Sequence, residues 1–372
     1  MKHSIVITYH KNKDMLLYCL ARILKTTPDY VEIIIVGNNA DSKELDFSID
    51  NPRCRFYKFY SNIQYPKAIN IGVSKCKGEI VTFVDADIFV WEGWYESLYK
   101  CLSSKSNIGA VSSKLINPLN NRILDFGIMY SRFNAAHTMM GLKYNHPLTM
   151  QDRKAQTLCS AILMTPKHIF DMVGGLDEEI PYSYTDCDYC LRIRDIGYES
   201  WVAHSSCAFH KGSTSSNNSK SQFSYYRLDA KGIYGMKDYA KFKYDIWDWY
   251  KISSNFLLGK KINIASKYLL IDLSTMYNRR EYYDMISNNL NIEFYDIVEK
   301  PDNCRDNNHI VLYDTISFNY IDLNTPIVYF VDTFVSLFNN ELWFSLRNID
   351  KDLVFDRHGN IMLLKDIAEN KF

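Results

Sequence analysis

Two aspartates, Asp85 and Asp87, follow an apolar run at residues 80–84 that is rich in β-branched and aromatic side chains. Such a run is typical of a buried parallel strand, and ligands of open α/β sheets bind beyond the carboxyl ends of the strands. Two carboxylates there would offer hard oxygen ligands to a divalent cation that also meets a diphosphate. Helix capping is the alternative role for strand-end aspartates. The pair therefore predicts an enzyme that handles a nucleotide-activated group.

The first half of the chain alternates predicted strands and helices, which indicates βαβ units and a mixed, mainly parallel sheet with flanking helices. We expect strands at 4–9, 32–36, 55–59, 79–84, 108–112, 123–130 and 202–210, and helices at 15–24, 67–76, 91–102 and 186–197. A second α/β pattern predicts strands at 268–273, 292–298, 309–313 and 327–331, and helices at 281–289 and 338–349.

These patterns predict three parts: a first α/β domain at 1–235, an aromatic and basic helical connector at 236–262, and a smaller C-terminal α/β domain of unknown role at 263–372. A chain of 372 residues is long enough for two domains. Several C-terminal strands end in aspartate, namely Asp272, Asp314 and Asp332, and we interpret these residues as caps and turn residues.

Composition narrows the class of protein. Lys plus Arg and Asp plus Glu both total 43, so the net charge is zero, which argues against a nucleic-acid-binding surface. We find no signal peptide and no apolar run of membrane-spanning length. The nine cysteines have no framework spacing, and free thiols fit a reducing cytoplasm. Cys187 and Cys190 form a lone C-x-x-C within a predicted helix and are expected to be small core residues.

Seven segments, in order along the chain, resemble the family 2 glycosyltransferases, which have the GT-A fold. They are residues 5–9, 33–36, 67–72, 84–87, 174–178, 186–188 and 210–213. The resemblance covers residues 1 to about 235 and does not extend to 260–372.

The resemblance implies a divalent metal, Mn²⁺ or Mg²⁺, that bridges the diphosphate of a nucleotide sugar. Asp87 would be the principal ligand, Asp85 would face the ribose or a metal-bound water, and His210 would be a third ligand. A purely structural role is the alternative for His210. Such a metal stabilises the negative charge that develops on a departing nucleoside diphosphate.

Asp186 corresponds to the general base of the inverting members of the family, which takes the proton of the attacking acceptor hydroxyl. Thr185 stands where the family often has Glu. Asp188 is two residues further along the predicted helix, about 200° around its axis, so both carboxylates cannot face one substrate. We expect Asp188 to pair with Arg192, four residues later.

The resemblance also implies substrate-binding residues. The donor-binding residues would be Thr8, Tyr9, Asn38, Lys67, Asn70, Asp85 and Asp87, and the acceptor-binding residues Gly174, Gly175, Asp177 and Glu178. An ordinary turn with capping carboxylates is the alternative for 174–178. Gly37 stands where the family usually has an Asp that contacts the nucleoside, and Asn38 or Asp41 would substitute for it. A UDP-sugar is the default donor, and dTDP- and GDP-sugars remain open.

The leading hypothesis is a metal-dependent inverting glycosyltransferase that acts on a glycan or lipid-linked saccharide in surface polysaccharide synthesis. The Ser- and Asn-rich stretch 212–219 would suit a lid that excludes water. A lipid-linked acceptor would place the enzyme at the inner membrane face, with Lys237–Lys261 as an interfacial helix. Packing between the two domains is the alternative for that span.

Two other functions remain open. A sugar nucleotidyltransferase would need a glycine-rich loop after the first strand, and residues 10–14 contain no glycine. A catalytically silent nucleotide- or carbohydrate-binding protein is favoured by Gly37, whereas the presence of Asp85, Asp87 and Asp186 argues against it. The oligomeric state is left open.

Overall fold

The computed structural model describes most of the first 210 residues and several segments beyond them. The described residues are 2–130, 135–180, 184–210, 264–274, 280–299, 324–332 and 350–369, with Asn255, Leu257, Lys260 and Phe334. Five predictions therefore lie outside the described residues: the strand at 309–313, the cap or turn role of Asp314, the helix at 338–349, the stretch 212–219 and nearly all of Lys237–Lys261.

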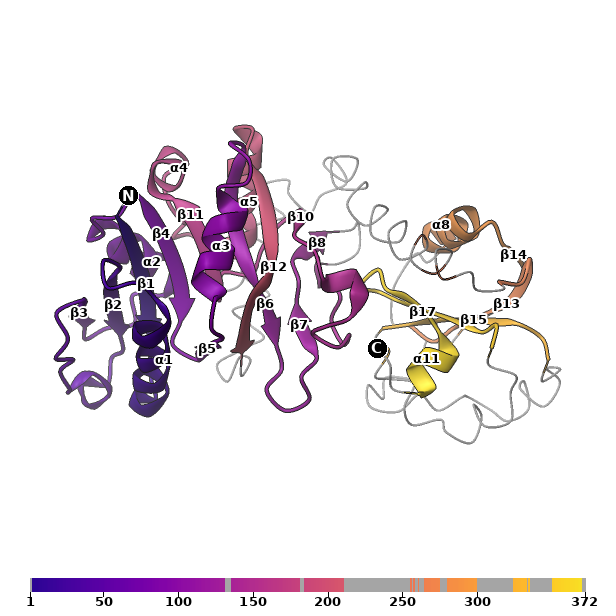
Figure 1. The fold of residues 1–372 in the computed structure, drawn as a ribbon, viewed down its shortest axis with the longest axis horizontal. Coiled ribbons are helices and arrows are strands. Elements are labelled where there is room, and N and C mark those ends of the chain that lie inside the picture. The colour runs from indigo at the N-terminus through magenta and orange to yellow at the C-terminus, as the bar shows by residue number, and fades with distance from the viewer. Residues whose placement is uncertain are drawn as a thin grey trace.

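The N-terminal part alternates strands and helices, as expected (Figure 1). Its strands are β1 (His3–Tyr9), β2 (Glu32–Asn38), β3 (Cys54–Phe59), β4 (Ile80–Asp85), β5 (Ile88–Val90), β6 (Ile108–Ile116), β7 (Ile123–Asp125), β8 (Ile128–Tyr130), β9 (Ala135–His137), β10 (Arg153–Ala155), β11 (Ile162–Pro166) and β12 (Glu199–His210). Its helices are α1 (Lys13–Thr26), α2 (Tyr65–Ser74), α3 (Trp94–Leu102), α4 (Lys167–Met172) and α5 (Thr185–Asp195), with 3₁₀ turns η1 (Ser42–Leu45) and η2 (Pro147–Thr149).

The central sheet has the order β10-β12-β6-β11-β4-β1-β2-β3, with β5 paired to β12 and β7 to β6. Strands β1 to β4 are parallel, and β6 is parallel to β12, whereas β11 runs antiparallel between β4 and β6. The predicted mixed, mainly parallel sheet is therefore confirmed. Thr8 of β1 lies beside Asp85 of β4, so the carboxyl edge of the parallel strands is where polar side chains gather.

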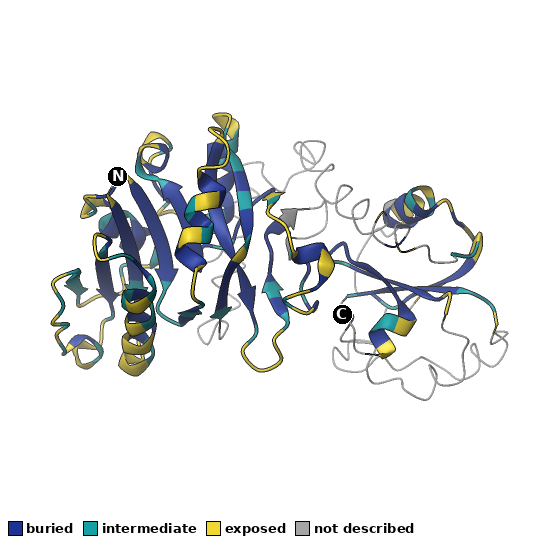
Figure 2. Ribbon diagram, in the orientation of Figure 1, coloured by how far each residue is buried: buried dark blue, intermediate teal, exposed yellow. Residues whose placement is uncertain are grey.

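Helices cover both faces of this sheet because alternate strand residues point to opposite faces. One buried apolar cluster joins Ile5, Ile7, Ile33 and Ile35 to α1 and α3, and another joins Val6, Ile34 and Val36 to α2, α4 and α5. Figure 2 shows the consequence, with buried strands between helices whose outer faces are exposed. Cys187 and Cys190 are buried on α5, as predicted.

The C-terminal part has a second sheet, of order β14-β13-β15-β16-β17. Its elements are β13 (Lys267–Asp272), α8 (Arg280–Leu290), β14 (Glu293–Glu299), β15 (Ile327–Val331), β16 (Leu353–Asp356), β17 (Ile361–Leu363) and α11 (Leu364–Ala368). Strands β13 to β16 are parallel and β17 is antiparallel. Asp272 accepts hydrogen bonds from the amide and hydroxyl of Ser274, which is a turn-residue role. Among the described residues, no helix combines the length and apolar character needed to span a bilayer.

Two predicted elements differ from the structure. The strand expected at 123–130 is broken into β7 and β8, because the Asp125 carboxylate accepts from the amide of Gly127, which has a φ of 96°. The helix expected from 91 instead begins at Trp94, after strand β5 and after Gly93 at a φ of 76°.

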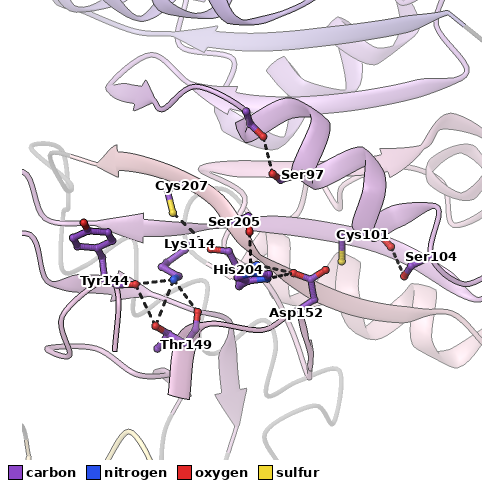
Figure 3. A network of polar contacts seen from close by, with 11 residues as sticks. Ser97, Cys101, Ser104, Lys114, Tyr144, Thr149, Asp152, His204, Ser205 and Cys207 are labelled. Carbon is purple, nitrogen blue, oxygen red and sulfur yellow. Dashed lines mark hydrogen bonds and ion pairs between the residues drawn. The ribbon is translucent and has the colours of Figure 1, made fainter. Parts of the chain in front are cut away.

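Lys114 is a buried cation that holds the loop around η2. It is 1% exposed, and its Nζ donates to the carbonyl oxygens of Tyr144 (2.7 Å) and Thr149 (2.8 Å) (Figure 3). Burial lowers the pKa of Lys114. Both carbonyl oxygens would lose this donor if the side chain were apolar.

We expect Lys114→Met to lower the free energy of unfolding by about 2–4 kcal/mol, because each buried acceptor left unpaired costs about 1–3 kcal/mol. The matched control is Lys154→Met, since Lys154 is 57% exposed in its ion pair with Glu199. Exposed pairs contribute about 0–1 kcal/mol. Urea denaturation measures both, and equal losses would contradict the assigned role of Lys114.

Candidate active site

Asp85, Asp87 and His210 come together at the carboxyl edge of the N-terminal sheet. Asp85 ends β4, and His210 ends β12 and pairs with Ile88 of β5, directly after Asp87. One potential ligand atom from each of the three lies within 4.8 Å of the others, and His210 Nε2 is 3.6 Å from Asp87 Oδ2. Residues more than 120 positions apart in the sequence thus form one cluster that fits a divalent metal.

The electrostatics of this cluster favour a bound cation. Burial raises the pKa of Asp85 well above its usual range, and the negative charges of Asp87 and Asp186 raise it further, against a hydrogen bond from Thr8. Burial lowers the pKa of His210. A neutral imidazole and two carboxylates form the kind of ligand set that a dication needs, since its charge offsets the repulsion between the carboxylates.

Asp186 is fixed at the start of α5 by two backbone amides. Its Oδ2 accepts from the Ser160 amide (2.9 Å) and its Oδ1 from the Cys187 amide (2.8 Å). Burial raises the pKa of Asp186 despite these bonds. Asp188 is 1% exposed and pairs with Arg192 at 2.8 Å, so the two carboxylates diverge as the helical spacing predicts.

Tyr65 lies near both Asp85 and Asp186. Its hydroxyl donates to Ser160 Oγ at 2.9 Å. Burial raises the pKa of Tyr65 well above 10, and the negative charges of Asp85 and Asp186 add to that effect. The sequence reasoning missed this residue, although it begins the helix that carries Lys67 and Asn70.

The pair of Asp125 and His137 is a second feature that sequence reasoning missed. Asp125 is 1% exposed, and its Oδ1 lies 2.7 Å from Nδ1 of His137, whose side chain is 42% exposed. Burial would lower the pKa of His137, but the hydrogen bond and charge of Asp125, with the charge of Asp186, raise it overall. The charges of Asp125 and His137 also act on His210, so the pair lies beside the metal-ligand cluster.

The predicted donor residues have different surroundings. Tyr9 is buried, with its hydroxyl bonded to Glu44, and Lys67 is exposed. Asn38 is 7% exposed and accepts from the Ile63 amide at 2.7 Å. A Cβ on Gly37 would lie 2.7 Å from Leu45 Cδ2 and 2.8 Å from Phe56 Cε2. Close packing explains why the family's usual Asp is absent at this position.

The predicted acceptor segment, residues 174–178, is tied to Asn70. Asn70 Nδ2 donates to the Leu176 carbonyl (2.9 Å) and to Glu178 Oε1 (3.1 Å), and its Oδ1 accepts from the Leu176 amide. A surface pocket is lined there by Asn70, Val173, Gly174, Leu176, Asp177, Glu178 and Arg192. Arg192 is six residues beyond Asp186, roughly 9 Å along α5. The pocket therefore lies to one side of the proposed base.

We expect Gly175→Ala to lower the free energy of unfolding by about 2–4 kcal/mol, from left-handed strain and overpacking together. Gly175 has a φ of 76°, and an added Cβ would lie 2.6 Å from Asn70 Oδ1. Gly174→Ala is the matched control, since Gly174 has a φ of 78° but nothing within 4 Å, and should cost about 1–2 kcal/mol. Equal losses in thermal denaturation would show that contact with Asn70 is unimportant.

Comparison with known proteins finds similarity in the N-terminal part. Residues 4–150 match the model of glycosyl transferase family 2. The chain is 28% identical over 224 residues to the uncharacterized protein y4gI of Sinorhizobium fredii, which covers 57% of this chain and 24% of that protein. It is 33% identical over 106 residues to the glycosyltransferase GlyG of Streptococcus pneumoniae, over 27% and 35% of the two chains. Residues 4–150 of this chain therefore resemble glycosyl transferase family 2, as its motifs predict.

Further matches are more distant. The O-antigen biosynthesis protein RfbC of Myxococcus xanthus is 23% identical over 209 residues, which is 53% of this chain and 16% of that protein. Among solved structures, GalNAc-T7 with UDP, GalNAc and Mn²⁺ overlaps at a TM-score of 0.49 and 16% identity, over 56% of this chain and 44% of that one. The chain spans 16% to 35% of the length of the curated relatives it matches.

Proposed function

We propose that this protein is a metal-dependent, inverting glycosyltransferase that moves a sugar from a nucleotide-sugar donor to a saccharide or lipid-linked saccharide. The observation that carries the proposal is the cluster of Asp85, Asp87 and His210 beside Asp186. This arrangement has a place for a metal and an ordered carboxylate next to it. A role in surface polysaccharide synthesis is supported by the similarity to a protein named for O-antigen biosynthesis.

Asp85, Asp87 and His210 would hold the metal. Two carboxylates and one imidazole suit Mn²⁺ better than Mg²⁺, which prefers oxygen ligands and keeps several waters. When bound, the metal supplies charge stabilisation to the departing diphosphate. The proposed donor side also includes Thr8, Tyr9, Asn38, Lys67 and Asn70, with a UDP-sugar as the first donor to test. The segment 174–178 remains the proposed acceptor side.

Asp186 would act as the general base. The amides of Ser160 and Cys187 hold its carboxylate in place, so it can take the proton of an acceptor hydroxyl as that oxygen attacks the anomeric carbon. Asp188 is occupied by Arg192 and has no part in this step. Attack from the face opposite the diphosphate inverts the anomeric configuration.

The test is a panel of UDP, GDP and dTDP, each with Mn²⁺, Mg²⁺ or neither, monitored by the melting temperature of the full chain. Ligand that binds only the folded state raises the melting temperature. We expect one nucleotide to do so only with metal, and its sugar conjugate to be consumed. Binding without consumption of any sugar conjugate would favour a silent binding protein, and no binding would reject the proposal.

A further inference from the structure

The C-terminal part packs against the segment of the N-terminal part that follows β6. One continuous buried apolar cluster contains Met139 and Leu142 of that segment together with Phe355 and Ile361 of the second sheet. Lys260 lies 3.8 Å from Asp366 of α11. Burial, with the charge of Lys260, lowers the pKa of His146 to about 4. In Figure 1 the second sheet lies beside the edge that carries β7, β8 and β10.

A tight turn between β16 and β17 carries the polar part of this contact. Asp356 is fully buried, and its Oδ1 accepts from the amides of His358 (2.9 Å) and Asn360 (3.0 Å). Asp356 Oδ2 accepts from Asn360 Nδ2 at 2.8 Å. These bonds fix the main chain of the turn and hence the direction in which His358 projects.

His358 contacts His137 from the C-terminal side. The His358 side chain is 2% exposed, and its ring faces the main chain of His137. Burial and the charge of Arg357 lower the pKa of His358 to about 3, so the ring is neutral. Among the described residues, neither ring nitrogen of His358 meets a partner at full hydrogen-bond geometry, and the His137 main chain is the hydrogen-bonding group that acts on the ring. Burying a polar imidazole without strong hydrogen bonds costs free energy of folding. We therefore expect His358 to do more than fill a space in the core.

The hairpin that carries His137 is held from the other side by α5. His137 pairs with Ile128 across β8 and β9, and Ile128 packs with Cys187 and Leu191, just beyond Asp186. Asp125 binds Nδ1 of His137, which leaves Nε2 as the ring nitrogen that can meet a ligand. His137 is thus fixed by three elements while remaining half-exposed beside the proposed base.

We propose that Nε2 of His137 hydrogen-bonds a hydroxyl of a saccharide acceptor, and that His358 of the C-terminal part is a positioning residue that holds His137 in place. This inference rests on the proposed function and gives the C-terminal part a role in acceptor recognition. An imidazole whose other nitrogen is bound by a carboxylate can accept from or donate to a sugar hydroxyl. The acceptor hydroxyl that Asp186 deprotonates would belong to the same sugar.

The structure offers a matched control in a second His–Asp pair. His204 Nδ1 lies 2.7 Å from Asp152 Oδ1, and Nε2 of His204 meets Ser205 Oγ at 2.9 Å (Figure 3). His204 lies in the irregular stretch of β12 between Ala203 and Cys207, between three and four ladder positions before His210, which is roughly 12 Å along the strand. The control pair has the same internal geometry without a place beside Asp186.

The experiment compares wild type with His137→Ala, His358→Ala, their double variant and His204→Ala, all as full chains. Acceptors are a panel of p-nitrophenyl glycosides, and the donor is the sugar conjugate of the nucleotide that binds with Mn²⁺. We expect His137→Ala to raise the acceptor KM about tenfold or more, with the Mn²⁺-dependent melting shift retained. His204→Ala should match wild type.

Non-additivity separates positioning from mere structural support. If His358 acts through His137, His358→Ala should raise the acceptor KM by itself but add nothing to His137→Ala. His358→Gln, which keeps a polar group, should restore part of the loss, and it replaces His358→Ala if that variant does not fold. Additive effects, or an unchanged acceptor KM in His137→Ala, would overturn the inference.

The proposed function and this inference fail differently. If wild type binds no nucleotide, the proposed transferase function is rejected. Nucleotide binding and donor consumption with no glycosylation of any panel member reject the saccharide acceptor. Transfer that is insensitive to His137 and His358 rejects only the role given to these residues and to the C-terminal part.

Discussion

Asp87→Ala is expected to abolish the metal-dependent rise in melting temperature that a nucleotide produces, and to lower the rate of sugar transfer by about 10²–10³-fold. Asp87 supplies one of three candidate ligands, and its Oδ2 is 3.6 Å from His210 Nε2. Without Asp87, only Asp85 and His210 remain as protein ligands, and two ligands are not enough to bind the metal in competition with its hydration by water. The measurement is the melting temperature with UDP, GDP or dTDP, with and without Mn²⁺.

The Asp87→Ala variant should fold normally. The Asp87 side chain is 24% exposed, and its negative charge raises the pKa of buried Asp85. The control is Asp171→Ala, whose carboxylate is 54% exposed in an ion pair with Lys167. A melting shift that persists in Asp87→Ala would place the metal, and with it the diphosphate, elsewhere.

Asp186→Asn is expected to lower kcat by about 10²–10⁴-fold, the usual contribution of a general base, while nucleotide binding is retained. The amide oxygen of Asn can still accept one of the two backbone amides that hold Asp186, but the amide group cannot take a proton. Steady-state kinetics with the best glycoside acceptor measures the loss.

The control for this experiment is Asp188→Asn on the same helix. Asp188 is buried and paired with Arg192, so its replacement should reduce the melting temperature more than kcat. The opposite pattern, with kcat lost in Asp188→Asn and kept in Asp186→Asn, would exchange the roles of the two residues.

The pH profile tests the same assignment. Burial raises the pKa of Asp186, and only the ionised carboxylate is a base. The transfer rate should therefore reach its maximum above this raised pKa and fall as the pH drops through it. The fall should occur at a higher pH than an Asp of ordinary pKa would give. Asp186→Asn should lack this acidic limb.

Local patterns were enough for much of the fold. The apolar run before Asp85 predicted β4. The strand beside it, β1, and the next strand, β2, have the same β-branched character. Helical spacing predicted the divergence of Asp186 and Asp188. The short elements β16, β17 and α11 were missed because three to five residues do not span enough periods to carry a signal.

The chain's periodicity and motif order thus determined the class of sheet, the strand-end carboxylates and the resemblance to family 2, because these depend on neighbours in the sequence. Tertiary structure alone decided that His210 meets Asp87, that Asp125 binds His137, and that His358 reaches His137 from a second sheet. His210 and Asp87, and likewise His358 and His137, are more than 120 positions apart in the chain. Only the pairing of β12 with β5 and β6, and the packing of the second sheet, bring them into contact.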